Sequence, residues 1–180
     1  GFPVDVRGFE EGLANHQELS RTAESGQFKS GLGDHSEETT ALHTATHMLQ
    51  AALRRVLGDE VGQKGSNITP ERLRFDFTYH DKMTADQIKQ VEDIVNEEIK
   101  KDLKVTVETL TPEEAVAKGA MAFFSSKYGE QVTVYSIGDF SKEVCAGPHV
   151  THTGDMGHFH ILKEESSSAG VRRIKAVLEK

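Results

Sequence analysis

The chain has 180 residues, of which 36% are hydrophobic and 28% are charged, with one cysteine and no tryptophan. This composition is typical of a soluble α/β or α+β protein; it excludes an internal disulfide, and no apolar run is long enough for a membrane span. The net charge of −8 argues against a wide nucleic-acid-binding surface, and the single cysteine fits a cytoplasmic location.

The first 33 residues are predicted to form a connecting arm. Residues 8–24 carry a thin apolar stripe that is typical of a solvated helix, and a glycine-rich run at 26–33 ends it. The compact domain is therefore expected at 34–180. The chain begins with Gly-Phe-Pro and no methionine, which favours an excised part of a longer protein, although a processed tag would look the same.

A long amphipathic helix is predicted next, with Asp34 and Glu37 as a capping box and Gly58 at its end. Its apolar residues recur at helical spacing and form a core-facing stripe. His43 and His47 lie one turn apart at the margin of that stripe, so both rings reach the same face. Two imidazoles at this spacing can form half of a zinc site, although such pairs more often lie on a solvated helix face.

The rest of the chain alternates between strand and helix patterns. Residues 63–67 are interpreted as a polar link or a bulged strand, and residues 72–78 show the period of two of a half-buried strand. Capping-box helix starts occur at Thr84 and Thr111. Further strands are expected at 105–107, 131–137, 157–163 and 171–178. This order predicts an α+β fold, a two-layer sandwich of a mainly antiparallel sheet with the long helices on one face.

The lone cysteine offers the other half of a metal site. Cys145 and His149 are four residues apart in a Gly-Pro loop that can bend a thiolate and an imidazole toward one ion. A histidine at this distance from a single cysteine is uncommon by chance at this composition. We therefore predict one Zn²⁺, at the edge between the long helix and this loop, held by His43, His47, Cys145 and His149.

Several motifs resemble, in the same order, those of the editing domain of alanyl-tRNA synthetase, its second additional domain. The segment at 16–21 also resembles the stretch before that domain, so the resemblance covers essentially the whole chain. Six motifs in register are far more specific than any one of them, and they strengthen the zinc assignment. The motifs are HTATH at 43–47, QKGS at 63–66, LRFDF at 73–77, IGDFS at 137–141, CAGPH at 145–149 and SAGVRRI at 168–174.

The resemblance implies a zinc-containing hydrolase that cuts the ester of serine or glycine wrongly attached to the alanine tRNA. Its partners would be the acceptor end of that tRNA and the rest of the synthetase chain, with no membrane. Thr46 could offer its hydroxyl to a substrate serine, and Gln63 could hold substrate or water. The alternatives are a helix threonine bonded to its own backbone and a solvated loop glutamine. Basic residues expected to contact the tRNA, if they are not simply a solvated face, are Lys64, Arg74, Arg172 and Arg173.

One departure keeps other functions open. The family's Cys-Gly-Gly-Thr-His is Cys-Ala-Gly-Pro-His at 145–149, and its Gly-Pro-His part also resembles the related domain of threonyl-tRNA synthetase, whereas the segment at 167–174 favours the alanyl family. A free-standing trans-editing deacylase is a further alternative. A function of a different class is a tRNA-binding module in which zinc only stabilises the fold and no ester is hydrolysed. Four protein ligands are typical of a closed structural site, whereas catalysis needs an open position, so the sequence leaves the role of zinc open.

Overall fold

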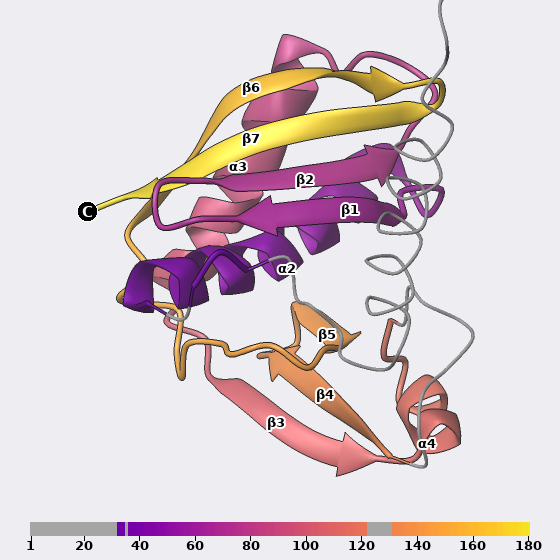
Figure 1. Ribbon diagram of the computed structural model, residues 1–180, viewed down its shortest axis with the longest axis vertical. Coiled ribbons are helices and arrows are strands. Elements are labelled where there is room, and N and C mark those ends of the chain that lie inside the picture. The colour runs from indigo at the N-terminus through magenta and orange to yellow at the C-terminus, as the bar shows by residue number, and fades with distance from the viewer. Residues whose placement is uncertain (1–31, 35, 122–130) are drawn as a thin grey trace, which may run out of the picture. The chain divides into compact units, whose positions relative to one another are not determined.

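The computed structural model describes residues 32–34, 36–121 and 131–180. These residues belong to one compact unit, Gly31–Lys180, shown in Figure 1. The predicted helix at 8–24 lies outside the described residues, as does nearly all of the predicted arm at 1–33. The division into an arm and an editing domain therefore stays a prediction.

Helix α2, Glu37–Leu57, carries the histidine pair. Its N-cap is Ser36, whose hydroxyl accepts a hydrogen bond from the Thr39 amide at 3.2 Å, so the predicted capping box of Asp34 and Glu37 is wrong. The Asp34 carboxylate instead accepts the Ser36 amide at 3.0 Å. Both Asp and Ser are favourable N-caps, and local preference alone does not choose between two caps so close together. Gly58 ends the helix as predicted, with a φ of 108° that favours glycine.

Four antiparallel strands form the larger sheet. Phe75 pairs with Ile174 on its apolar face, and Asp76 pairs with Arg173 on the opposite face, which we call the outer face. The segment that the sequence left open is a bulged strand, because its pairing register shifts between residues 63 and 65. The strands, in sheet order, are β1 (Gln63–Ile68), β2 (Leu73–Thr78), β7 (Val171–Glu179) and β6 (His158–Ser168).

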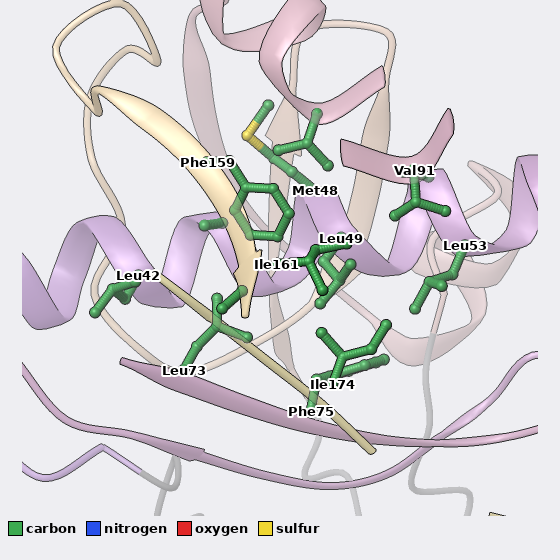
Figure 2. Packing of buried hydrophobic residues seen from close by; sticks show 14 of the residues in the cluster. Leu42, Met48, Leu49, Leu53, Leu73, Phe75, Val91, Phe159, Ile161 and Ile174 are labelled. Carbon is green, nitrogen blue, oxygen red and sulfur yellow. The ribbon is translucent and has the colours of Figure 1, made fainter. Parts of the chain in front are cut away.

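Helix α3, Ala85–Lys100, packs beside α2 and against β6. It begins with the predicted capping box: the Thr84 hydroxyl accepts the Gln87 amide at 3.1 Å, and the Gln87 side chain accepts the Thr84 amide at 3.0 Å. Figure 2 shows the core between these helices and the larger sheet, where the side chains of Met48, Leu49 and Phe159 meet. Within the described ranges, no helix is both long and apolar enough to cross a bilayer.

A second sheet has three antiparallel strands in the order β3-β4-β5. They are β3 (Val105–Leu110), β4 (Val132–Ile137) and β5 (Ser141–Val144), and the short helix α4 (Pro112–Ala117) starts after the predicted cap Thr111. The α+β class is confirmed, but the strands form two sheets where one was expected. Helix α2 contacts β1 and β2 of the larger sheet and β5 of the smaller one, so it lies between the two sheets (Figure 1).

Candidate metal centre

The four predicted metal ligands lie together. His43 and His47 come from the middle of α2, and Cys145 and His149 from the segment that follows β5. One ligand atom from each residue lies within 4.8 Å of the other three, and His43 Nε2 is 3.5 Å from Cys145 Sγ. The arrangement could hold a metal ion.

Each histidine has a protein partner for its Nδ1 atom. His43 Nδ1 is 2.8 Å from the carbonyl oxygen of Pro148, so this nitrogen carries the proton and donates it. His47 Nδ1 is paired with the carboxylate of Glu143, which is 3% exposed. In both rings, Nε2 is left for another bond, and the same holds for His149, described in the next paragraph. This division of the two nitrogens is typical of histidines that bind a metal.

Thr44 holds the third histidine through its hydroxyl. That hydroxyl donates to the Thr40 carbonyl at 3.2 Å and accepts the Val150 amide at 3.1 Å. It is also 3.1 Å from His149 Nδ1. Because the hydroxyl proton is used on Thr40, we assign the shared proton to His149 Nδ1, which then donates to Thr44. The Nε2 lone pair of His149 is thereby free to bind a metal.

The residues present fit zinc. His149 Nε2 is buried and has no hydrogen-bond partner among the described residues. Leaving a buried polar atom unpaired costs free energy unless another group, such as a metal ion, binds to it. One thiolate and three imidazoles are a donor set that zinc prefers. Gly147 makes the close approach possible, because a Cβ at that position would lie 2.2 Å from Cε1 of His43. Its amide also donates to Cys145 Sγ at 3.4 Å.

The protonation states of the four clustered side chains suit the binding of a cation. Burial alone would lower the pKa of His47, but the Glu143 carboxylate and Cys145 raise it to about 10. Burial raises the pKa of the Cys145 thiol, yet the three neighbouring histidines lower it to about 3. Burial lowers the pKa of His149 to about 4. Without an ion, the cluster is therefore a thiolate beside a protonated His47 and a neutral His149, and a metal would replace one His47 proton.

Two predicted pocket residues have local partners. Thr46 is 4% exposed, and its hydroxyl donates to the Leu42 carbonyl at 2.9 Å, the helix-bonded geometry considered as an alternative above. Its lone pairs can still accept a hydrogen bond. Gln63 is the first residue of β1 and pairs with Phe77. The substrate roles of Thr46 and Gln63 stay predictions.

The predicted tRNA-binding residues do not form one patch. Arg74 and Arg173 flank Asp76 on the outer face, at 3.6 Å and 2.8 Å from its carboxylate, and Lys64 is exposed on β1. Arg172 points to the other face, because side chains alternate along a strand. There it pairs with Glu164, whose side chain is 1% exposed.

A cavity of about 470 Å³ reaches one metal ligand, His149. It is lined by the first turns of α2, by the β1–β2 turn and by the segment from 149 to 156. Carboxylates outnumber cationic groups in its wall, which favours a cationic ligand group over a phosphate. The acidic lining residues are Glu37, Glu38, Glu71 and Asp155.

Sequence reasoning missed three residues that support the centre: Glu143, Thr44 and Tyr135, whose ring centroid is 4.2 Å from that of His149. Two of them lie close to ligands in the sequence, Thr44 next to His43 and Glu143 two residues before Cys145. A polar residue beside a proposed ligand is a usable signal for such support. Tyr135 carried no comparable signal.

Comparison with known proteins places these residues in a family context. Residues 132–175 match the family model of the threonyl and alanyl tRNA synthetase second additional domain. The chain is 60% identical to an alanine–tRNA ligase of Treponema denticola over 99% of this chain, and 57% identical to that of Treponema pallidum over 100%. It is 50% identical to the alanine–tRNA ligase of Nitrosomonas eutropha over 75% of this chain and 16% of the relative. The chain spans 30% of the length of the two Treponema relatives.

Proposed function

Because the chain belongs to the alanyl-tRNA synthetase family and carries its second additional domain, we propose that it hydrolyses the ester of serine or glycine wrongly attached to the alanine tRNA. The observation that carries the proposal is the four-residue centre, in which each histidine keeps Nε2 free while Nδ1 is held by the protein. A centre organised in this way supports a bound zinc ion.

The need for such a reaction follows from the size of the substrates. A pocket that accepts alanine cannot strongly reject glycine, and an added hydroxyl is discriminated by only a few kcal/mol. A second site that hydrolyses the wrong products removes the remaining errors. All three relatives named above are alanine–tRNA ligases, which favours alanine tRNA over threonine tRNA and a ligase over a free-standing deacylase as the context.

The residues of the centre would hold the ion and the substrate in distinct ways. His43, His47, Cys145 and His149 would bind Zn²⁺, which supplies a net positive charge for polarising a carbonyl or orienting water. Glu143 and Thr44 keep two of the rings oriented. The Thr46 hydroxyl donates to Leu42, so toward a substrate serine it would act as an acceptor. Gln63 would hold the substrate or a water molecule.

The tRNA would be held by few contacts from this chain. Arg173, Arg74 and Lys64 offer positive charge on β7, β2 and β1, but Asp76 neutralises part of it. The net charge of −8 disfavours a large contact area with tRNA phosphates. The tRNA would therefore bind mainly to other parts of a synthetase. We therefore propose the acceptor end of the alanine tRNA as the part that this chain contacts.

Deacylation of mischarged tRNA by the zinc-loaded chain tests the proposal. Serine and glycine should be released from the alanine tRNA faster than alanine, and a chelator or Cys145→Ser should abolish most of this release. The Ala146→Ser variant is a matched control, because Ala146 is exposed beside the centre. No release by the zinc-loaded chain at high protein concentration would contradict hydrolysis.

A second candidate function has one observation in its favour. Four protein ligands close the coordination shell of zinc, as in structural sites. In that case the ion would cross-link α2 and the segment after β5, and the chain would bind tRNA without hydrolysing its ester. Tight tRNA binding with no deacylation of any ester would favour this candidate.

A further inference from the structure

Gln50 is a buried polar residue of α2 that the metal centre does not use. It is 1% exposed, and its side-chain nitrogen Nε2 has no hydrogen-bond partner among the described residues. Leaving a buried donor without an acceptor costs free energy, and folded proteins pair nearly all such groups. An unpaired amide N–H inside the fold therefore leaves place for an acceptor that the described residues do not supply.

The position of Gln50 on α2 relates it to the metal ligands. Successive residues of an α-helix are about 100° apart around the axis, so Gln50 lies about 60° from His47 and inside the arc of about 100° between His47 and Thr46. Along the axis it is about 4.5 Å beyond His47. The amide thus belongs to the same stripe of α2 as the two histidine ligands and Thr46.

The other unpaired atoms of the described residues have local explanations. His149 Nε2 is a metal ligand atom in the centre described above. Arg74 Nε and Glu164 Oε2 belong to groups whose other atoms form ion pairs with Asp76 and Arg172. Gln50 is neutral and has no comparable partner within the described part of the chain, so its amide is the group that most needs a further acceptor.

We propose that Gln50 Nε2 donates a hydrogen bond to the carbonyl oxygen of the aminoacyl ester. This inference rests on the proposed function and adds a contact to it. During hydrolysis, water adds to the carbonyl carbon, the bond to the ribose oxygen breaks, and the products are the free amino acid and the ribose hydroxyl. Negative charge develops on the carbonyl oxygen before that bond breaks, and a fixed N–H donor stabilises it. The contact is common to seryl and glycyl esters, because both have this carbonyl.

The Gln50→Leu variant tests the contact through two changes of opposite direction. Leucine fills similar space without a buried donor, so thermal stability should stay equal or rise. Hydrolysis of seryl and glycyl esters should fall by about tenfold or more, and by similar factors. A residue with a purely structural role would instead lower stability on substitution, or leave hydrolysis unchanged. Met48→Leu is the matched control, since it exchanges buried apolar side chains in the same helix and should leave hydrolysis as it is.

Binding of an adenosine that carries serine through a 3′-amide gives a readout that does not depend on hydrolysis. The amide keeps the carbonyl oxygen, so its Kd should rise by about fivefold in Gln50→Leu at unchanged zinc content. An unchanged Kd and an unchanged rate would overturn the role of Gln50 while the proposed function stands. If the parent chain binds the amide but hydrolyses no ester, the proposed function falls, and the Kd of the variant decides on Gln50. A parent chain that neither binds nor hydrolyses overturns both.

Discussion

The side chains around the centre define which nitrogen of each histidine is available. Pro148, Glu143 and Thr44 each engage one Nδ1, and this leaves three Nε2 atoms close to the Cys145 sulfur. Hydrogen bonds of this kind fix the tautomer and the orientation of a ring before an ion binds. The ligand geometry therefore depends on residues that never contact the metal.

Replacing Gly147 by alanine should weaken zinc binding. The added Cβ would lie 2.2 Å from Cε1 and 2.8 Å from Nδ1 of His43, whose ring is held by its bond to Pro148 and stacks on His149. The ring or the loop must move, and we expect zinc affinity to fall by about tenfold or more. Competition with a chromophoric chelator measures the affinity. Ala146→Ser, at the exposed neighbouring position, should bind zinc like the parent, and parental affinity in Gly147→Ala would contradict the packing argument.

Thr46→Val separates a substrate contact from helix packing. Valine keeps the shape but removes the hydroxyl that would accept a hydrogen bond from a bound serine, at a cost of about 1–3 kcal/mol in seryl-tRNA hydrolysis. Glycyl-tRNA has no such hydroxyl and should be affected much less. The loss of the bond to Leu42 should matter little for folding, since that carbonyl also belongs to the helix ladder.

Three deacylation rates at equal zinc content measure the effect of Thr46→Val. Alanyl-tRNA should be hydrolysed at the parental rate or faster, because a valine-lined pocket no longer disfavours a methyl group. Equal losses on all three substrates would show that Thr46 shapes the helix or the metal centre. Unchanged rates would place it away from the substrate.

At the scale of elements, β7 presents neighbouring arginines to opposite faces. Arg172 pairs with the buried Glu164, whereas Arg173 pairs with Asp76 on the outer face. Arg172→Ala should therefore destabilise the fold by about 3 kcal/mol, because it leaves a buried carboxylate without its partner. Chemical denaturation measures this loss. The double variant Arg172→Met with Glu164→Leu should recover most of it, and a stable Arg172→Ala chain would contradict the pairing.

Arg173→Ala is the matched change on the outer face. The Asp76 side chain is 11% exposed and accepts two hydrogen bonds from Arg173, so their loss should lower stability by about 1–3 kcal/mol, with Arg74 still paired to the carboxylate. If Arg173 contacts a tRNA phosphate, binding should weaken and the slope of log K against log salt should fall by about 1. An unchanged slope would show that this part of the outer face does not meet the tRNA.

The end of α3 is joined to the segment after the metal centre by Asp102 and His152. His152 Nδ1 lies 2.6 Å from the Asp102 carboxylate, which also accepts the Gly154 amide at 2.8 Å. This hydrogen bond raises the pKa of His152 above 6.5 and lowers that of Asp102 below 3.8. The pair is therefore fully charged between about pH 3.8 and 6.5. Its contribution to stability is lost as the pH rises through the folded pKa of His152, or falls through that of Asp102.

Asp102→Asn should return the pKa of His152 toward 6.5. Asparagine tolerates the φ of 50° at this position, so the backbone itself should not be strained. An NMR titration of the His152 ring measures the shift. A pKa that stays raised in the variant would show that another group, such as Asp155 at 3.3 Å, holds the proton.

At the scale of the whole molecule, the metal centre links the two sheets. Its histidines come from α2, which packs against the larger sheet, and the segment with Cys145 and His149 follows β5 of the smaller one. A ligand that binds only the folded state stabilises it by about 4 kcal/mol at a thousand times its Kd. Zinc removal should therefore lower the melting temperature of the chain.

Thermal unfolding with a chelator, and again after zinc is restored, measures this contribution. The melting temperature should fall and then recover. Cys145→Ser, which lacks one ligand, should respond little to the same chelator. If the parent chain melts at the same temperature with and without zinc, the ion does not join the two parts.

The sequence by itself determined features that depend on residues within about four positions of one another. The capping boxes at Thr84 and Thr111, the end of α2 at Gly58 and the shared face of His43 and His47 are all of this kind. Helix caps and helix faces are local, because a helix bonds and aligns residues three or four apart. The Cys145 spacing and the ordered motifs then indicated the family and the four ligands.

The tertiary structure alone decided which distant groups meet. It set the split into two sheets, because an alternating pattern indicates a strand but not its neighbour. It also brought Glu143 to His47, aligned Gly147 with His43, and left the amide of Gln50 buried without an acceptor among the described residues. These relations join segments up to about a hundred residues apart, and they arise from the packing of α2 between the sheets, which no local pattern encodes.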